Sequence, residues 1–160
     1  MNGSGDYQAV IATPLGRVGI CMSDKTLSAL DYLPIDAAEQ VPLNAATEAV
    51  VTQLIAYFHH PLASFNVPLA PAGTAFQQRV WAALQAIPIG SVLSYGELAQ
   101  RLDTAPRAIG GACRSNPIPI LIPCHRVVSR QGLGGYAGEV KGEPLAIKRW
   151  LLRHEGVAVE

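Results

Sequence analysis

The chain begins with short β-prone runs of hydrophobic and polar residues, at positions 7–12, 17–22 and 27–33. The first two runs are joined by Thr13-Pro14-Leu15-Gly16, a turn-forming tetrapeptide with proline at its second position. The opening third is therefore predicted to be an antiparallel meander of three strands.

The hydrophobic period then changes to that of a helix over about residues 45–59, with Asn44 as the N-cap. Four apolar residues are predicted to share its buried face: Val50, Leu54, Ile55 and Phe58. His59 and His60 end this helix, where positive charge is favourable. Residues 61–73 are rich in Pro and Ala with little periodicity, which predicts a connection between a small and a larger subdomain.

Two capping boxes mark helices in the second half of the chain. Thr74 and Gln77 open the first helix, and Pro88 and Gly90 are expected to end it. Its predicted buried face consists of Phe76, Val80, Trp81 and Leu84. Ser94 and Glu97 open a second helix, which runs to about Leu102. Pro106 then starts a third helix that ends near Arg114.

The last two of these helices are short and close together, as in a helix-turn-helix. Ala108, Gly110 and Gly111 give the second of them a smooth face, which Arg107 and Arg114 flank. Paired glycines cost about 1 kcal/mol each against alanine in a helix. They permit either tight packing on a neighbouring helix or close approach to a flat partner. With no long polar side chains to read base edges, the second alternative favours the minor groove of DNA.

A proline-rich segment, residues 116–128, carries the candidate chemistry. Its prolines exclude a helix and predict a stiff, buried, irregular path that ends at Cys124. An inert buried thiol is the simpler interpretation of a cysteine in an apolar run. However, His125 and Arg126 are costly to bury, and cationic neighbours lower the pKa of a thiol. Adjacent side chains diverge, so any activation of Cys124 by His125 is expected to pass through a water or a sharp turn.

The end of the chain adds a glycine-rich loop at 129–138, which contains Tyr136, and a final helix that starts at Pro144 and stops at Gly156. Glu155 falls in the last turn of this helix, where a carboxylate opposes the helix dipole. We therefore expect Glu155 to have a partner elsewhere, and a histidine is one candidate.

Composition narrows the class of protein. The 160 residues are 49% hydrophobic, which suffices for a core without disulfides or metal. Three widely spaced cysteines suit a reducing cytosol, and no export signal or membrane span is visible, which predicts a cytoplasmic protein. Residues 1–74 hold two basic and six acidic residues, whereas residues 75–160 hold ten basic and six acidic ones. This asymmetry is a weak indication that the second half binds a polyanion.

Several motifs in the second half resemble those of the O6-alkylguanine-DNA alkyltransferases. They are Ser94-Tyr95, the run from Arg107 to Ala112, Asn116-Pro117, the run from Pro123 to Val128, Gly135-Tyr136-Ala137-Gly138, Trp150-Leu151-Leu152 and His154-Glu155-Gly156. The resemblance is strong over about residues 74–157 and weaker before them. It implies an α/β fold: a ribonuclease-H-like N-terminal domain, residues 1–70, followed by a helical DNA-binding and alkyl-acceptor domain, residues 71–160.

The resemblance also implies direct reversal of DNA damage. An alkyl group would leave O6 of guanine, or O4 of thymine, and remain on the protein, so that each molecule acts once. Cys124 would be the acceptor, and His125 would take its proton through a water. Glu155 would orient His125, and Asn116 would pin the turn that leads to the cysteine.

In the same comparison the target base would be flipped out of the duplex through the minor groove. Arg107 would fill the vacated stack, and Tyr95 would push the 3′ phosphate and protonate the leaving guanine at N3. Main-chain groups of Cys124 and Val127 would bind the exocyclic amine, and the Ala137 amide would face O6. Pro119 and Tyr136 would form the wall of the pocket.

The resemblance is incomplete at two points. Residues 139–144 form a longer link than the family usually has, beside the alkyl pocket. The zinc ligands that some members carry have no counterparts, so no metal and no cofactor are expected. A monomer without membrane contact is predicted.

Two other functions compete with alkyl transfer. In alkyltransferase-like lesion sensors the nucleophile is replaced, whereas here Cys124 is intact. A cysteine hydrolase would need a histidine from a distant part of the chain and an oxyanion hole.

Overall fold

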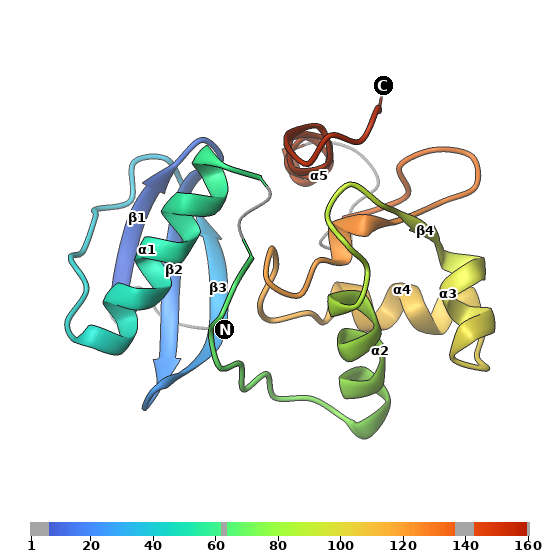
Figure 1. Ribbon diagram of the computed structural model, residues 1–160, viewed down its shortest axis with the longest axis horizontal. Coiled ribbons are helices and arrows are strands. Elements are labelled where there is room, and N and C mark those ends of the chain that lie inside the picture. Colours follow the sequence, from blue (N-terminus) through green and yellow to red (C-terminus); the bar gives the residue numbers. More distant parts are fainter. Residues whose placement is uncertain (1–6, 62–63, 137–142, 160) are drawn as a thin grey trace. The chain divides into compact units, whose positions relative to one another are not determined.

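The computed structural model describes residues 7–61, 64–136 and 143–159. The chain forms two compact units, Met1–Ala72 and Gly73–Glu160. Both are drawn in Figure 1, and each is described separately.

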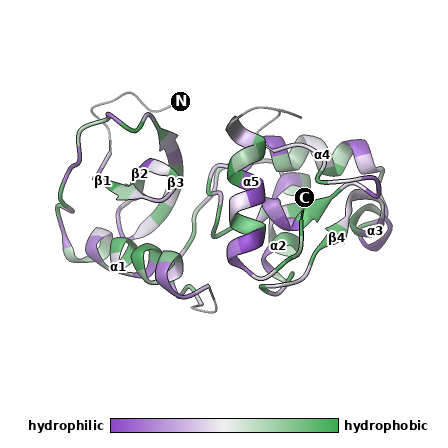
Figure 2. Ribbon diagram, turned by 90° about the horizontal axis from the view of Figure 1, so that it is seen from above, coloured by the Kyte–Doolittle hydropathy of each residue, from purple (hydrophilic) through white to green (hydrophobic). Residues whose placement is uncertain are grey.

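The N-terminal unit is a three-stranded antiparallel sheet with one helix (Figure 1). Its elements are β1 (Ala9–Thr13), β2 (Gly16–Ser23), β3 (Thr26–Leu33) and α1 (Ala45–His59). The strand order is β1-β2-β3, so the predicted meander is confirmed. Gly16, with φ of 104°, makes the turn between β1 and β2, a backbone conformation that glycine adopts without steric cost. Helix α1 covers one face of the sheet and alternates hydrophobic and hydrophilic stretches (Figure 2).

Helix α1 begins as predicted, because the Asn44 side chain accepts a hydrogen bond from the Thr47 amide. The predicted buried face was partly wrong. Ile55 is 43% exposed and Phe58 is only partly buried, whereas Tyr57 is fully buried. Tyr57 follows Leu54 and Val50 at spacings of three and seven, so it lies on the same face of the helix.

The C-terminal unit is mainly helical and holds one short parallel strand pair. Its elements are α2 (Ala75–Gln85), β4 (Leu93–Ser94), α3 (Tyr95–Arg101), α4 (Pro106–Arg114), the 3₁₀ turn η1 (Cys124–Arg126), β5 (Val127–Val128) and α5 (Glu143–His154). Both predicted capping boxes are present, with Thr74 and Ser94 as N-caps. Helix α2 ends at Gln85, before the proline and glycine that were expected to stop it.

Helix α4 is anchored on its buried side. Its buried residues are Ile109 and Ala112, and the indole Nε1 of Trp81 donates to the Ala112 carbonyl over 2.9 Å. A Cβ atom built at Gly110 or Gly111 would have no atom of other elements within 4 Å. The glycines are therefore not needed for packing within the described residues.

None of the helices in the described ranges is long and apolar enough to cross a membrane.

Candidate active site

The side chain of Asn116 makes two hydrogen bonds that hold residues 116–122, before Cys124, in a turn. The Asn116 Oδ1 accepts from the Ile118 amide at 2.9 Å, and its Nδ2 donates to the Ile122 carbonyl at 2.7 Å. Ile120 has a φ of 77°, a conformation that costs a β-branched residue about 1–3 kcal/mol. The Asn116 contacts hold this strained turn, which delivers Cys124 to a fixed position. The irregular path predicted for this segment is present as far as Cys124.

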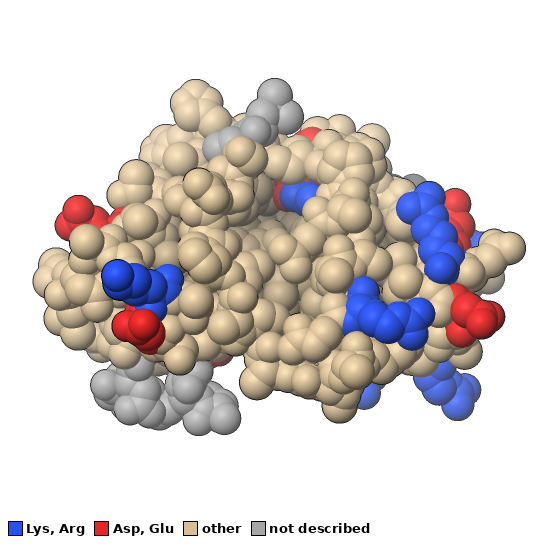
Figure 3. Space-filling model, turned by 60° about the horizontal axis from the view of Figure 1, so that its bottom comes forward, with Lys and Arg blue, Asp and Glu red and all other residues tan. Residues whose placement is uncertain are grey.

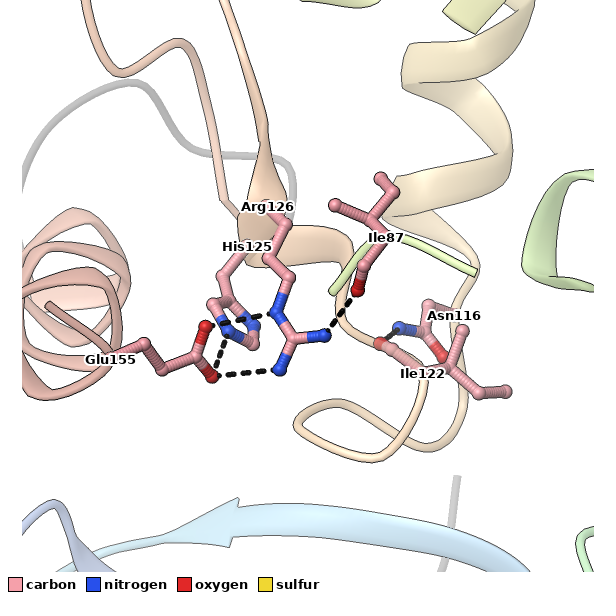
Figure 4. Close-up of polar contacts among 6 residues, drawn as sticks. All are labelled: Ile87, Asn116, Ile122, His125, Arg126 and Glu155. Carbon is pink, nitrogen blue, oxygen red and sulfur yellow. Dashed lines mark hydrogen bonds and ion pairs between the residues drawn. The ribbon is translucent and has the colours of Figure 1, made fainter. Parts of the chain in front are cut away.

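The 3₁₀ turn η1 contains Cys124, His125 and Arg126, and all three residues are buried. The His125 Nε2 lies 2.8 Å from Glu155 Oε2 (Figure 4). The other ring nitrogen of His125, Nδ1, is buried and has no hydrogen-bond partner among the described residues. The side chains of Cys124 and His125 are therefore not hydrogen-bonded to each other, as the divergence of adjacent side chains predicts.

Glu155 has a second partner that the sequence did not indicate. The Arg126 Nε donates to Glu155 Oε1 at 2.9 Å, and Nη2 donates to Oε2 at 3.0 Å. The remaining guanidinium nitrogen, Nη1, donates to the Ile87 carbonyl at 2.6 Å. Figure 4 shows the carboxylate facing both the imidazole and the guanidinium. This arrangement compensates the buried carboxylate charge and fixes the orientation of the imidazole.

Burial sets the resting protonation of the pair. It lowers the pKa of His125 below the usual 6.5, although the hydrogen bond and charge of Glu155 oppose this shift. Burial also raises the pKa of Cys124 above 9.0, while the Asn116 side chain and Lys148 lower it. At neutral pH the site therefore holds a neutral imidazole, which can act as a base, beside a protonated thiol.

Tyr95 opens α3 and lies against the glycine-rich loop. A Cβ atom at Gly134, where φ is +75°, would come within 2.9 Å of the Tyr95 ring. Burial, the largest cause, raises the pKa of Tyr95 to about 12, against a hydrogen bond from the Gly135 backbone. The phenol consequently remains protonated at neutral pH and can donate a proton or a hydrogen bond.

Comparison with known proteins identifies the family to which this site belongs. The family model described as 6-O-methylguanine DNA methyltransferase, DNA binding domain, matches residues 75–157. The model for the ribonuclease-like domain of the same proteins matches residues 7–71. The chain belongs to the 6-O-methylguanine DNA methyltransferase family. The family resemblance and the predicted two-part α/β fold are thereby confirmed.

Two curated relatives of the family are named methylated-DNA–protein-cysteine methyltransferase. The one from Methanosarcina acetivorans is 38% identical over 94% of this chain and 98% of its own. The one from Salmonella typhimurium is 42% identical over 91% and 93%. The solved structure of the Mycobacterium tuberculosis O6-methylguanine methyltransferase covers 91% of this chain and 90% of its own, with 38% identity and a TM-score of 0.77. A second structure from that organism, a complex with DNA, has a TM-score of 0.76.

Of the residues expected to contact DNA, Tyr95 lies on α3 and the others lie on α4. Arg107, Gly111 and Arg114 are exposed, and Ala108 and Gly110 are partly so. On the face shown in Figure 3, Lys and Arg side chains gather on the C-terminal unit, at the right of the view. The uneven charge of the two halves thus appears on this surface.

The expected pocket residues differ in burial. Val127 and Tyr136 are buried, and Pro119 is partly buried. Ala137 and residues 139–142 lie outside the described residues. In the described ranges no group of three or more His, Cys, Asp or Glu side chains could hold a metal ion.

Sequence reasoning placed the cation of Arg126 beside Cys124 but missed its pairing with Glu155, and it missed the buried Lys148 as a neighbour of the site. A signal for each was present in the sequence. Arg126 follows an apolar run, and Lys148 shares the apolar side of the last helix with Leu145 and Leu152, at spacings of three and four.

Proposed function

We propose that this chain repairs O6-alkylguanine in double-stranded DNA by moving the alkyl group to Cys124, irreversibly and once per molecule. The observation that carries the proposal is the arrangement of His125, whose Nε2 is held by Glu155 while its buried Nδ1 has no partner in the described residues. The name of the relatives, methylated-DNA–protein-cysteine methyltransferase, supports the same activity.

The chemistry follows from the two resting protonation states. The Cys124 thiol gives its proton to Nδ1 of His125 through a water, and Glu155 stabilises the imidazolium that forms. The thiolate attacks the alkyl carbon, so the S–C bond forms as the C–O6 bond breaks and its electron pair stays on guanine. Tyr95 donates a proton at N3, which leaves neutral guanine. The resulting thioether is stable, which explains a single turnover.

The base must leave the duplex to reach a buried sulfur. We infer that α4 enters the minor groove and that Arg107 fills the space left by the flipped base. Ala108, Gly110 and Gly111 would allow close approach, and Arg114 would bind a phosphate.

In the pocket, main-chain groups of Cys124 and Val127 would bind the exocyclic amine of guanine, and the Ala137 amide would face O6. Pro119 and Tyr136 would enclose the ring. O4-alkylthymine would be a second substrate, and the protein would act as a monomer.

A lesion sensor that binds without repair is the competing function, and the intact Cys124 favours transfer. Titration of the protein with duplex DNA that carries radiolabelled O6-methylguanine distinguishes the two. Loss of methyl from DNA should saturate at one per protein molecule, and Cys124→Ser should bind the duplex yet leave the methyl in place. Methyl transfer by Cys124→Ser would rule out the proposed acceptor.

A further inference from the structure

The side chain of Lys148, on α5, is fully buried, and its ammonium joins two segments of the C-terminal unit. Its Nζ donates to the Val127 carbonyl, in β5, at 2.7 Å and to the Gly135 carbonyl, in the glycine-rich loop, at 2.9 Å. Burial lowers the pKa of Lys148 to about 8, so the ammonium keeps its proton at pH 7 and both hydrogen bonds are charge-assisted. Lys148 therefore holds the loop against the strand that follows Cys124.

The Tyr95 ring lies against both Lys148 and the loop that Lys148 holds. The Lys148 Nζ is 5.8 Å from the centre of the ring, which is within the range of a cation–π contact. On the loop side, Gly134 has a φ of +75°, and a Cβ atom there would lie 2.9 Å from a ring carbon and 3.3 Å from the hydroxyl oxygen. The ring thus packs on the loop backbone so closely that a side chain at Gly134 would displace it.

The position of the loop depends on the ammonium for an electrostatic reason. The carbonyl oxygens of Val127 and Gly135 both point at the same Nζ. Removing the ammonium would leave two partial negative charges close together in a buried place, without the donor that they share. The loop is then expected to move away from β5. Tyr95 would lose its contact with the cation and its support on Gly134 at the same time.

We propose that Lys148 is the positioning residue for Tyr95. It fixes the glycine-rich loop on β5, and the loop and the ammonium together hold the phenol where it gives its proton to the leaving guanine. This inference rests on the proposed function, in which Tyr95 protonates N3 as the C–O6 bond breaks. Lys148 keeps its own proton throughout and acts through Tyr95. It takes no part in the proton transfer from Cys124 to His125.

Two electrophiles with different leaving groups test this role without DNA. Free O6-methylguanine releases a guanine that must gain a proton, whereas iodoacetamide releases iodide, which needs none. Lys148→Met keeps the length of the side chain and removes the ammonium. It should slow methyl transfer from the free base at least about tenfold, since a general acid contributes about 10²–10⁴-fold. The rate of Cys124 alkylation by iodoacetamide, followed by peptide mapping, should be unchanged.

The comparison with Tyr95→Phe separates positioning from general damage to the site. If Lys148 acts through the hydroxyl, Lys148→Met should cost little once the hydroxyl is absent, so the double variant should transfer methyl no more slowly than Tyr95→Phe alone. Losses that multiply in the double variant, or an equal loss with both electrophiles, would overturn the proposal. Arg153→Met removes an exposed cation from the same helix. It is the matched control and should leave both rates unchanged.

A second variant keeps Lys148 in place and disturbs the same contact from the loop. Gly134→Ala pushes a methyl group towards the Tyr95 ring and should show the same selective loss with O6-methylguanine; an unchanged rate would overturn the proposal.

Amide hydrogen exchange tests the Lys148 contact without any electrophile. In Lys148→Met the amides around Gly135 should exchange faster than in the wild type, while those of α2 and α4 keep their protection. Unchanged exchange around Gly135 would contradict the proposed role. A wild-type protein that reacts with iodoacetamide but not with O6-methylguanine would refute the proposed function, and the exchange measurement would still test the hold of Lys148 on the loop. The two failures are therefore distinguishable.

Discussion

Replacing the two glycines of α4 with alanine should stabilise the protein and weaken its binding to DNA. Nothing outside α4 lies within 4 Å of a Cβ atom at Gly110 or Gly111, and neither has a positive φ. Each alanine should therefore gain close to the full difference in helix propensity, about 1 kcal/mol. For a chain of this size, that gain corresponds to a rise in Tm of about 2–4 °C per substitution.

The opposite effect is expected on DNA. If the glycine face lies against the minor groove, an added methyl group must displace the backbone from the duplex. Overpacking of a close interface costs about 1–3 kcal/mol, which corresponds to a loss of affinity of about five- to 150-fold. Fluorescence anisotropy with a labelled duplex measures this loss, and scanning calorimetry measures Tm. Reaction with a free O6-alkylguanine base should be unchanged, because the base reaches Cys124 without the duplex.

Thr52→Ala provides the control, since Thr52 is exposed in α1 of the other unit. It should improve helix propensity without an effect on DNA affinity. A rise in Tm with unchanged affinity in the glycine variants would refute minor-groove docking of α4. A fall in Tm would show that the fold itself requires the glycines.

Three further substitutions and one pH profile test separate features of the C-terminal unit. Arg107→Ala should reduce repair of duplex DNA much more than reaction with a free base, and equal losses would exclude a role in flipping. Glu155→Gln should slow methyl transfer while DNA binding is kept, because it removes the group that raises the pKa of His125; an unchanged rate would remove Glu155 from the mechanism. In the wild type the rate should fall only below about pH 6.5, since burial lowers the pKa of the His125 base; a fall that begins well above this pH would contradict a neutral imidazole. Trp81→Phe leaves the Ala112 carbonyl without its donor and should destabilise the unit by about 1–3 kcal/mol, and denaturant unfolding checks this value.

Local signals in the sequence predicted most of the helices and strands. Capping side chains such as Asn44, Thr74 and Ser94 determine where helices begin through contacts within three residues, so the sequence alone suffices. The buried face of α1 could not be predicted as well. Several faces of that helix are apolar, and packing in the N-terminal unit selected the one with Tyr57.

Local geometry in the sequence also predicted part of the site, but not the contacts that tertiary folding makes. The geometry of adjacent residues indicated that His125 does not bind Cys124 directly, and the unfavourable place of Glu155 in its helix pointed to a distant partner. The partners of Arg126 and Lys148 were missed because they are backbone carbonyls and a carboxylate brought close only by tertiary folding. A cation within an apolar run indicates burial but does not identify what compensates its charge.

The most direct test of alkyl transfer is the mass of the intact protein after incubation with duplex DNA that contains one O6-methylguanine, followed by peptide mapping. The proposed function predicts the addition of one methyl group, on Cys124, that saturates at one per protein molecule. Binding of the duplex with no change in mass, or a methyl group on another residue, would contradict it.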